Sequence, residues 1–244
     1  MTKLNGVMGL DADISKLFPI EQVERGEAIQ LGGKVATGLN QTIKVNPDNG
    51  GVRLTISADE FTYQGDLNKS LRVVKSEFLF RNPEIIKSLG HDQRITISDP
   101  SKKAMTIKYY LQGREKESKT FSYDFNTIDS DTLIVFLQGM LLSGVQQFNC
   151  DLIAKGQRMK INVNFRLSEV AGFTPDPESN LPEKLVQFLA QKTEKYIYEM
   201  KLTGVLNLIV PGKYYYVFEK TLPHRLIAYW GGTSNQAELA YILP

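Results

Sequence analysis

Residues Met159 to Leu167 read MKINVNFRL, and this regular alternation of apolar and polar side chains decides the fold class. Successive side chains of a β-strand point to opposite faces, so this segment has one apolar and one polar face. The same period of two recurs from Val52 to Ser57, from Met105 to Leu111 and from Tyr214 to Phe218. A sheet with one polar face is normally antiparallel, because parallel strands are covered on both sides. The pattern therefore predicts a mainly antiparallel β-protein with a few helices.

Turn-forming segments separate the alternating runs. Asn46 to Gly51, Asp99 to Ser101, Gln112 to Arg114 and Lys155 to Gly156 each join two runs at the short spacing of a β-hairpin. Strands that are joined by hairpins lie side by side in chain order. The sequence thus predicts an antiparallel meander that forms an open barrel or roll around a helix.

Three segments with helical spacing interrupt the meander: Pro83 to Leu89, Asp131 to Ser143, and about Pro182 to Gln191. The first follows Asn82, a favoured N-cap residue, and stops at Gly90.

The second helix is expected to pack on the concave face of the sheet. Asp129 or Ser130 is its predicted cap, and Gly144 its predicted end. Its apolar residues share one helical face, which predicts burial of that stripe. The stripe consists of Leu133, Ile134, Leu137, Met140 and Leu141.

The 244 residues are predicted to form a single antiparallel β-rich domain over residues 26–244. Residues 1–25 form an N-terminal segment with a short helical turn at Ile14 to Phe18. One linker-like stretch, Thr174 to Asn180, precedes only about four predicted strands, a sheet that is marginal alone. We therefore interpret this stretch as a loop within the domain.

Composition excludes several classes of protein. Hydrophobic residues are 42% and charged residues 23% of the chain, as in globular rather than disordered proteins. Lys and Arg number 29 against 27 Asp and Glu, so no strong positive field favours nucleic acid as a partner. No apolar run is long enough for a membrane-spanning helix. A single cysteine and two histidines argue against an internal disulfide and a histidine-rich metal site, and we expect no cofactor.

The N-terminal residues bear on the compartment. Asn5, Gly6 and Gly9 interrupt the apolar residues, and Asp11 ends them, so the segment does not match a secretory signal. Two alternatives fit: a cytoplasmic protein, or a periplasmic or cell-envelope protein from which a signal has been removed.

No pattern of nucleophile and base predicts catalysis. Ser143 follows a helix and lacks the preceding glycine of a nucleophile elbow. His91 and His224 have no metal-binding spacing, and we interpret both as loop or edge residues. Cys150 is expected to be a buried structural thiol. Asp129 is interpreted as a helix cap, as is Asp131. The sequence therefore predicts a protein that is not an enzyme, with no catalytic and no metal-binding residues.

Aromatic side chains crowd the C-terminal part of the chain. Packing in the core and across strands is one interpretation; an apolar cavity lined by rings is the other. A curled sheet around a helix can hold an acyl chain or another apolar ligand. The candidate ligand-binding residues are Tyr214, Tyr216 and Trp230.

Three features together resemble the bacterial domain-of-unknown-function family 3108. They are the Asp129 to Asp131 opening of the second helix, the hairpin from Asn149 to Leu167, and the closing segment from Thr221 to Trp230 that leads to Glu238 and Leu239. The resemblance extends from about Gly26 to the C-terminus. It implies an exported envelope protein built mainly of antiparallel strands, and it supplies no catalytic residues. The chain differs from the family in lacking a signal sequence and in the helix near Pro182 to Gln191.

The leading hypothesis is an uncharacterised non-enzymatic envelope-type protein. It binds an apolar, lipid-like ligand or an envelope protein partner in or on its curved sheet. One alternative is a structural scaffold or interaction module that docks a partner by strand addition. The other is a hydrolase-type enzyme with dispersed acidic and tyrosine residues.

Overall fold

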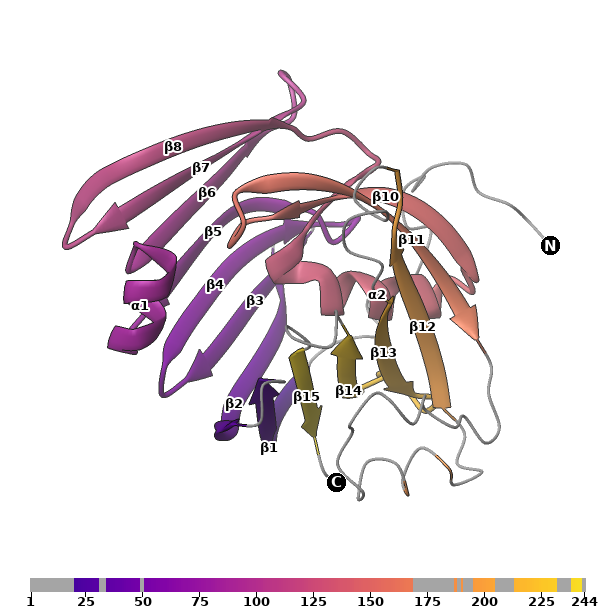
Figure 1. Ribbon diagram of the computed structural model, residues 1–244. Coiled ribbons are helices and arrows are strands. Elements are labelled where there is room, and N and C mark those ends of the chain that lie inside the picture. Colours follow the sequence, from indigo (N-terminus) through magenta and orange to yellow (C-terminus); the bar gives the residue numbers. More distant parts are fainter. Residues whose placement is uncertain are drawn as a thin grey trace.

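The computed structural model describes residues 20–30, 34–48, 51–168, 187, 190, 195–204, 213–231 and 238–242. Within these residues, fifteen strands form one sheet that curls around helix α2 (Figure 1). The strands are β1 (Ile20–Gln30), β2 (Lys34–Asp48), β3 (Gly51–Ala58), β4 (Phe61–Asn68), β5 (Val73–Phe80), β6 (Gln93–Asp99), β7 (Ala104–Leu111), β8 (Arg114–Ser122), β9 (Thr127–Asp129), β10 (Gln147–Ala154), β11 (Met159–Ser168), β12 (Lys195–Leu202), β13 (Lys213–Glu219), β14 (Leu226–Gly231) and β15 (Glu238–Ile242). The helices are α1 (Pro83–Leu89), the short 3-10 helix η2 (Ser130–Thr132) and α2 (Leu133–Leu142).

The strand order explains why the sheet curls. Strands β1 to β8 pair in chain order, strands β10 to β15 do the same, and β1 pairs with β15 in the middle of the sheet. The outermost strands are therefore β8 and β9, which only residues 123–126 separate in the chain. A flat sheet of this size would be roughly 65 Å wide at about 4.8 Å per strand, whereas the link reaches at most about 17 Å. The sheet must curl until its ends lie close together, which confirms the predicted meander and open barrel.

One strand pair departs from the predicted antiparallel pattern. β9 pairs with β10 in parallel, with Thr127 opposite Asp151 and Asp129 opposite Ile153. The chain leaves β9 through η2 and α2 before it returns as β10, and a helical crossover of this kind permits parallel pairing.

The predicted hairpins are present, with one shifted boundary. Gln112 and Gly113 both have positive φ, 53° and 73°, as a two-residue hairpin turn requires. Asp99 accepts a hydrogen bond at Oδ1 from the backbone N–H of Ser101 (3.0 Å) after β6. The turn predicted from Asn46 begins later, because β2 continues to Asp48.

The first predicted helix is confirmed, including the residues that cap its two ends. Asn82 accepts hydrogen bonds at Oδ1 from the backbone N–H groups of Glu84 (2.9 Å) and Ile85 (3.4 Å), and Gly90 ends α1 with φ 73°. Of the third predicted helix, Pro182 to Gln191, only residues 187 and 190 are described, and the predicted turn at Ile14 to Phe18 lies outside the described residues. β1 begins at Ile20, within the predicted N-terminal segment. The assignment of one domain to residues 26–244 stays a prediction.

Helix α2 corrects the prediction of a single apolar stripe. It begins at Leu133, because residues 130–132 form the 3-10 turn η2 instead. Val135 and Phe136, which lie outside the predicted stripe, are buried together with Leu137, while Ile134 of the stripe is only partly buried. A helix that is enclosed by a curved sheet has apolar neighbours on nearly every side, so a one-sided stripe is not required.

Candidate functional site

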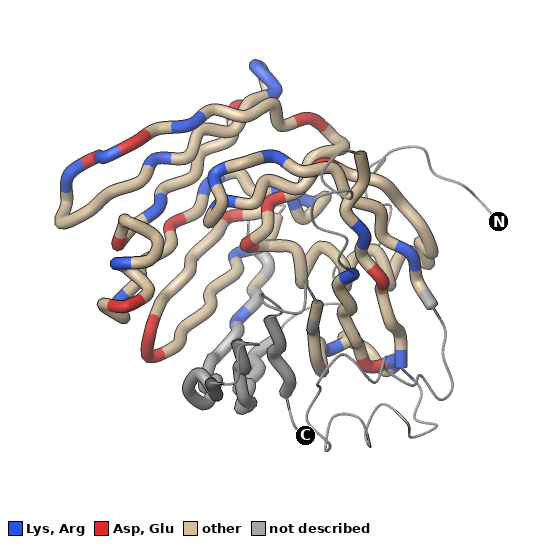
Figure 2. Tube along the Cα trace, viewed as in Figure 1, with Lys and Arg blue, Asp and Glu red and all other residues tan. Residues whose placement is uncertain are grey.

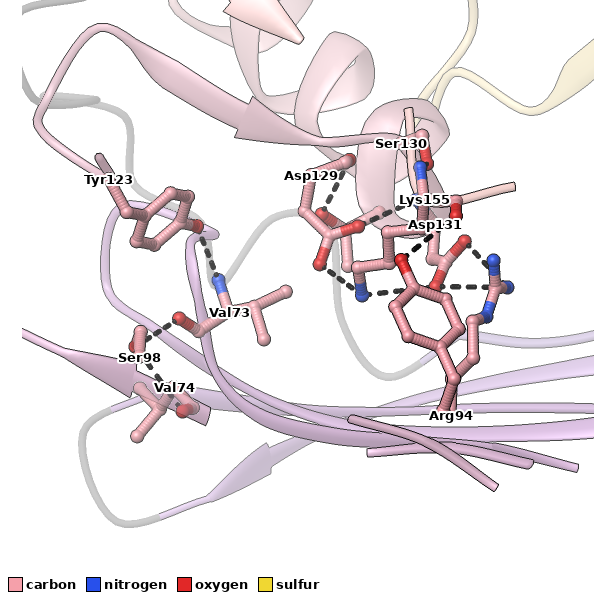
Figure 3. Close-up of polar contacts among 11 residues, drawn as sticks. Val73, Val74, Arg94, Ser98, Tyr123, Asp129, Ser130, Asp131 and Lys155 are labelled. Carbon is pink, nitrogen blue, oxygen red and sulfur yellow. Dashed lines mark hydrogen bonds and ion pairs between the residues drawn. The ribbon is translucent and has the colours of Figure 1, made fainter. Parts of the chain in front are cut away.

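Four charged side chains meet in the interior, where the two ends of the sheet approach each other (Figure 3). Arg94 comes from β6, Asp129 ends β9, Asp131 lies in η2, and Lys155 follows β10. We call these four residues the ion cluster. The side chains of Asp129 and Lys155 are 0% exposed, and those of Arg94 and Asp131 are 6% and 10% exposed.

The distances within the ion cluster make a continuous chain of ion pairs. Lys155 Nζ lies 2.6 Å from Asp129 Oδ2 and 3.1 Å from Asp131 Oδ2. Arg94 Nη2 lies 3.3 Å from Asp131 Oδ1. Two cations therefore face two carboxylates, so the cluster as a whole carries no net charge. This balance offsets much of the large cost of taking ionised groups out of water.

The two carboxyl groups differ in their proton affinity. Burial raises the pKa of Asp129, and the nearby Asp131 carboxylate adds to this against the opposing charge of Lys155. Burial also acts to raise the pKa of Asp131, but the charges of Arg94 and Lys155 outweigh it and hold that pKa below its usual value. Asp131 is thus the carboxylate that stays ionised, and Asp129 takes up a proton more readily.

Local hydrogen bonds fix the two loops that carry the cluster. Asp129 accepts a hydrogen bond at Oδ1 from the backbone N–H of Asp131 (2.9 Å), so it also caps η2 as predicted. Tyr109 Oη donates to the backbone carbonyl of Lys155 (3.1 Å), and Ser130 Oγ accepts from the backbone N–H of Lys155 (3.4 Å). These contacts hold Lys155 between the two carboxylates. The position of Lys155 in a turn does not predict this role.

Strand β6 faces the cluster with its polar side inward. Arg94 and Thr96 are 5% and 1% exposed, whereas Ile97 on the other face is 49% exposed. The Arg94 guanidinium packs over the rings of Phe78 (4.7 Å) and Phe80 (5.1 Å), which shields its apolar faces. Sequence reasoning missed Arg94. The signal that could have revealed Arg94 is a strand whose polar residues occupy the buried face.

Tyr63 lies on the same inner face and is fully buried. Its hydroxyl passes directly over Gly65, where an added Cβ would lie 2.5 Å from Tyr63 Oη. Burial raises the pKa of Tyr63 well above its usual value, and the charges of Asp129 and Asp131 add to this effect. The phenol therefore stays protonated beside the two carboxyl groups.

Side chains, rather than a backbone ladder, connect β8 to the β10–β11 hairpin. Arg158 Nη1 pairs with Glu117 Oε2 (3.2 Å), and Lys119 Nζ donates to the backbone carbonyl of Arg158 (3.3 Å). Lys160 Nζ donates to Ser122 Oγ (2.8 Å). Acidic and basic residues alternate along β8 (Figure 2), a feature of edge strands that resist unwanted pairing.

Both histidines are buried, a property that the sequence analysis did not address. They lie in loops as expected, but His91 is 0% and His224 is 7% exposed. His91 Nδ1 lies 3.0 Å from the backbone carbonyl of Leu89, and burial lowers the pKa of His91. His224 Nδ1 lies 3.1 Å from the carbonyl of Glu219. Among the described residues, no group of His, Cys, Asp and Glu side chains suits a metal ion.

Cys150 is buried, as predicted for a structural thiol. It is 0% exposed, and burial raises its pKa, which keeps the thiol protonated and unreactive.

The three predicted ligand-binding residues lie on adjacent strands. Tyr216 is 8% exposed and stacks on Tyr229 with ring centroids 6.0 Å apart. Tyr214 is partly buried against the hydrophobic core. Trp230 pairs in register with Tyr215, and its side chain lies outside the described residues. A ligand-binding role for the three residues stays a prediction.

Aromatic rings from β10 to β13 share the hydrophobic core with α2. Phe148 lies 6.1 Å from Phe136 of α2 and stacks on Phe165 at 4.8 Å between ring centroids. We call these rings the aromatic shell. It consists of Phe148, Phe165, Tyr198, Tyr216 and Phe218, all buried.

Side-chain hydrogen bonds from Gln138 and Tyr198 tie α2 and the residues after it to neighbouring elements. Gln138 Nε2 donates to the backbone carbonyl of His224 (3.0 Å), and Tyr198 Oη donates to the carbonyl of Val145 (2.6 Å). The other described contacts around the helix are mainly apolar. Apolar packing therefore holds α2 in the concave side of the sheet.

Comparisons with known proteins add a fold neighbour. No family model matches the chain, and no curated protein matches it either. One similar solved structure is a beta-barrel-like protein of domain of unknown function DUF1849 from Brucella abortus. The two share 8% sequence identity, with 92% of this chain and 96% of that chain covered and a TM-score of 0.47. In the part of this chain that the structure describes, no helix combines the length and apolarity needed to cross a membrane.

Proposed function

We propose that the protein is a non-enzymatic binding protein that holds an apolar, lipid-like ligand within its curved sheet. The observation that carries this proposal is the burial of α2 against the concave side of a sheet whose strands β10 to β13 contribute the aromatic shell. Ten residues of α-helix form a rod about 15 Å long, and this rod is buried on nearly every side. A concave surface that accommodates one apolar rod has the chemistry to accommodate an acyl chain.

The few polar contacts of α2 support an exchange of occupants. Gln138 supplies a hydrogen bond to the β13–β14 connection, and Tyr198 supplies one to Val145 just beyond the helix. Each such bond contributes only about 1 kcal/mol net. These bonds add little to the apolar packing of α2, so a ligand has mainly apolar contacts to replace. We propose that its acyl chain takes over contacts of α2 with the aromatic shell, beside Tyr214.

The pairing and burial of the charges in the ion cluster support a non-enzymatic function. Its four charged groups are paired with one another and almost fully buried. A general acid or base must come within hydrogen-bonding reach of a substrate. These groups are instead committed to joining the two ends of the sheet.

A fluorescent fatty acid tests the ligand-binding function. We expect cis-parinaric acid to bind the purified protein saturably, and native mass spectrometry with solvent extraction to detect a bound lipid. Tyr216→Ala should weaken binding, whereas Tyr215→Ala, at the alternate position of the same strand, should change it little. Folding of both variants is checked by circular dichroism. Failure of the wild-type protein to bind the probe, together with a lipid-free extract, would overturn the proposal.

We also propose that the protein acts in the cell envelope, as a member of domain-of-unknown-function family 3108. The features of Asp129 to Asp131, the Lys155 hairpin and the closing segment support this placement. Fractionation of the native host, with an antibody against the chain, tests the compartment. Recovery with periplasmic or membrane proteins is expected, and recovery with cytosolic proteins alone would contradict it.

A protein partner on β8 is a second candidate function. Among the described strands, β8 ends the sheet and has a strand neighbour on one side only. Such an edge can accept a further strand from another protein. Its alternating charges select against indiscriminate pairing, so a cognate partner must complement them. A pull-down from envelope extracts, repeated with Arg114→Glu and Lys116→Glu, distinguishes this function from ligand binding. These changes leave the contacts of Glu117 and Lys119 with Arg158 in place.

A further inference from the structure

An amine and a carboxyl group are held in contact inside the ion cluster, away from solvent. Lys155 Nζ and Asp129 Oδ2 are 2.6 Å apart, and both side chains are 0% exposed. A lysine amine is a nucleophile in its neutral form, and a protonated carboxyl group is an electrophile. The two reacting groups of an amide bond are therefore already in contact.

A third group is placed to move the proton. Asp131 Oδ2 lies 3.1 Å from the same Lys155 Nζ, within reach of the proton that this nitrogen must lose. Arg94 pairs with Asp131 at 3.3 Å and keeps it ionised, so Asp131 is available as a base.

The buried setting favours condensation over a lasting ion pair. Two charges out of water are costly, and a proton transfer from the ammonium to the carboxylate converts them into a neutral amine and a neutral acid. Burial raises the pKa of Asp129, which favours the protonated acid. Fixed contact between the groups also makes the reaction intramolecular, with effective concentrations that can reach about 10⁵ M or more.

We propose that Lys155 and Asp129 condense spontaneously into an intramolecular amide cross-link, with Asp131 as the proton-transfer group. The proton of the ammonium first passes to the Asp129 carboxylate. The lone pair of Nζ then attacks Cγ of Asp129, and the C–N bond forms. Asp131 accepts a proton from Nζ and delivers it to the Asp129 hydroxyl. The C–O bond breaks, and one water molecule leaves, with no oxidant, reductant or cofactor involved.

The cross-link joins the end of the sheet to its neighbouring hairpin. Asp129 is the last residue of β9, and Lys155 directly follows β10. β9 has only three residues and pairs with β10 alone among the described strands. A covalent bond at this point secures the shortest strand of the sheet. The proposal concerns the chain itself and does not depend on the ligand-binding function.

A second lysine–aspartate pair in the same hairpin is an internal control. Lys160 Nζ lies 2.8 Å from Asp151 Oδ2, but these side chains are 23% and 28% exposed. Burial acts to raise the pKa of Asp151, but hydrogen bonds from Lys160 and Asn162 outweigh it and lower that pKa. Water and these bonds stabilise both charges, so this pair stays an ion pair.

Intact-mass spectrometry of the purified, denatured chain tests the proposal. The wild-type mass should be lower than the sequence mass by one water, and tandem mass spectrometry of a digest should join the Lys155 and Asp129 peptides. Lys155→Arg, which keeps the charge but lacks a nucleophilic amine, should have its full sequence mass. Asp131→Asn should leave the chain largely unlinked. The Lys160 and Asp151 peptides should be separate in every sample.

Two outcomes would overturn the inference. One is a wild-type chain at its full sequence mass. The other is a chain that has lost one water by forming a succinimide at an aspartate. Hydroxylamine cleaves a succinimide, whereas it leaves an amide cross-link intact. Complete cross-linking in Asp131→Asn would overturn the role of Asp131. Because the wild-type measurement needs no ligand and no variant, its result is separate from that of the fatty-acid experiment.

Discussion

The two buried regions of this protein, the aromatic shell around α2 and the ion cluster, are held together by opposite kinds of force. Contacts between the rings and the helix are apolar, individually weak and largely non-directional. The ion cluster depends on four specific charged groups at distances between 2.6 and 3.3 Å. An apolar surface can accept a different apolar occupant, whereas a buried ion cluster tolerates the loss of no partner. We therefore propose exchangeable binding in the first region and fixed closure in the second.

Leu137→Asp should have the largest effect on the aromatic side of this comparison. Leu137 is 0% exposed in α2, and a carboxylate there would be buried without a partner. We expect no folded protein by circular dichroism. Leu137→Met, which nearly conserves volume, should cost less than about 1.5 kcal/mol in urea unfolding. A folded Leu137→Asp variant with the wild-type melting curve would contradict the placement of α2.

Lys155→Met should have the next largest effect, and it breaks the ion cluster. It removes the proposed cross-link and leaves Asp129 buried without its closest cation, which should cost at least about 3–5 kcal/mol of unfolding free energy. Adding Asp129→Leu removes the uncompensated carboxyl group, while Arg94 and Asp131 still pair. The double variant should therefore be more stable than Lys155→Met alone. Strictly additive losses in the urea midpoints would show that the two groups act independently.

Gly65→Ala tests the packing of Tyr63 beside the ion cluster. The added Cβ would lie 2.5 Å from Tyr63 Oη and 2.9 Å from its ring, so the ring has to move. We expect a cost of about 1–3 kcal/mol. Gly156→Ala is the matched control, because no atom lies within 4 Å of its added Cβ. Equal thermal stability of the two variants would contradict the close packing of Tyr63 over Gly65.

Asp151→Asn should have the smallest effect, because the pair with Lys160 is partly exposed. Such pairs contribute less than about 1 kcal/mol after screening by solvent. The pKa of Asp151 is lowered in the folded protein from its usual 3.8, so its contribution to stability is present above that value. This contribution is lost as the pH falls through the lowered pKa. Unfolding curves of wild type and variant should differ slightly at neutral pH and converge in acid; a difference that grows in acid would contradict the assignment.

The sequence predicted those features that depend on neighbours along the chain. The period of two located the strands, because alternation records which face of each strand is buried. Asn82, Pro83 and Gly90 located α1, because helix caps are local hydrogen-bonding features. Helix α2 was predicted with the wrong burial, since the extent of its enclosure depends on how far the sheet curls.

The ion cluster was not predicted, because its residues come from separate segments and each has an adequate local explanation. Asp129 and Asp131 resemble helix caps, and Asp129 does cap η2. Lys155 occupies a turn, where charged residues are usually exposed. In β6 the usual rule is reversed, with Arg94 buried and Ile97 exposed. These groups come together only because the sheet curls until its end strands, β8 and β9, lie close to each other.

Hydrogen exchange, with and without a saturating fatty acid, tests the contrast between the two regions most directly. Bound fatty acid should speed exchange in α2, residues 133–142, because the ligand takes over its contacts with the aromatic shell. Residues 127–132 and 153–158, which carry or flank three members of the ion cluster, should stay equally protected. Unchanged exchange in α2, or loss of protection in both regions together, would contradict the account.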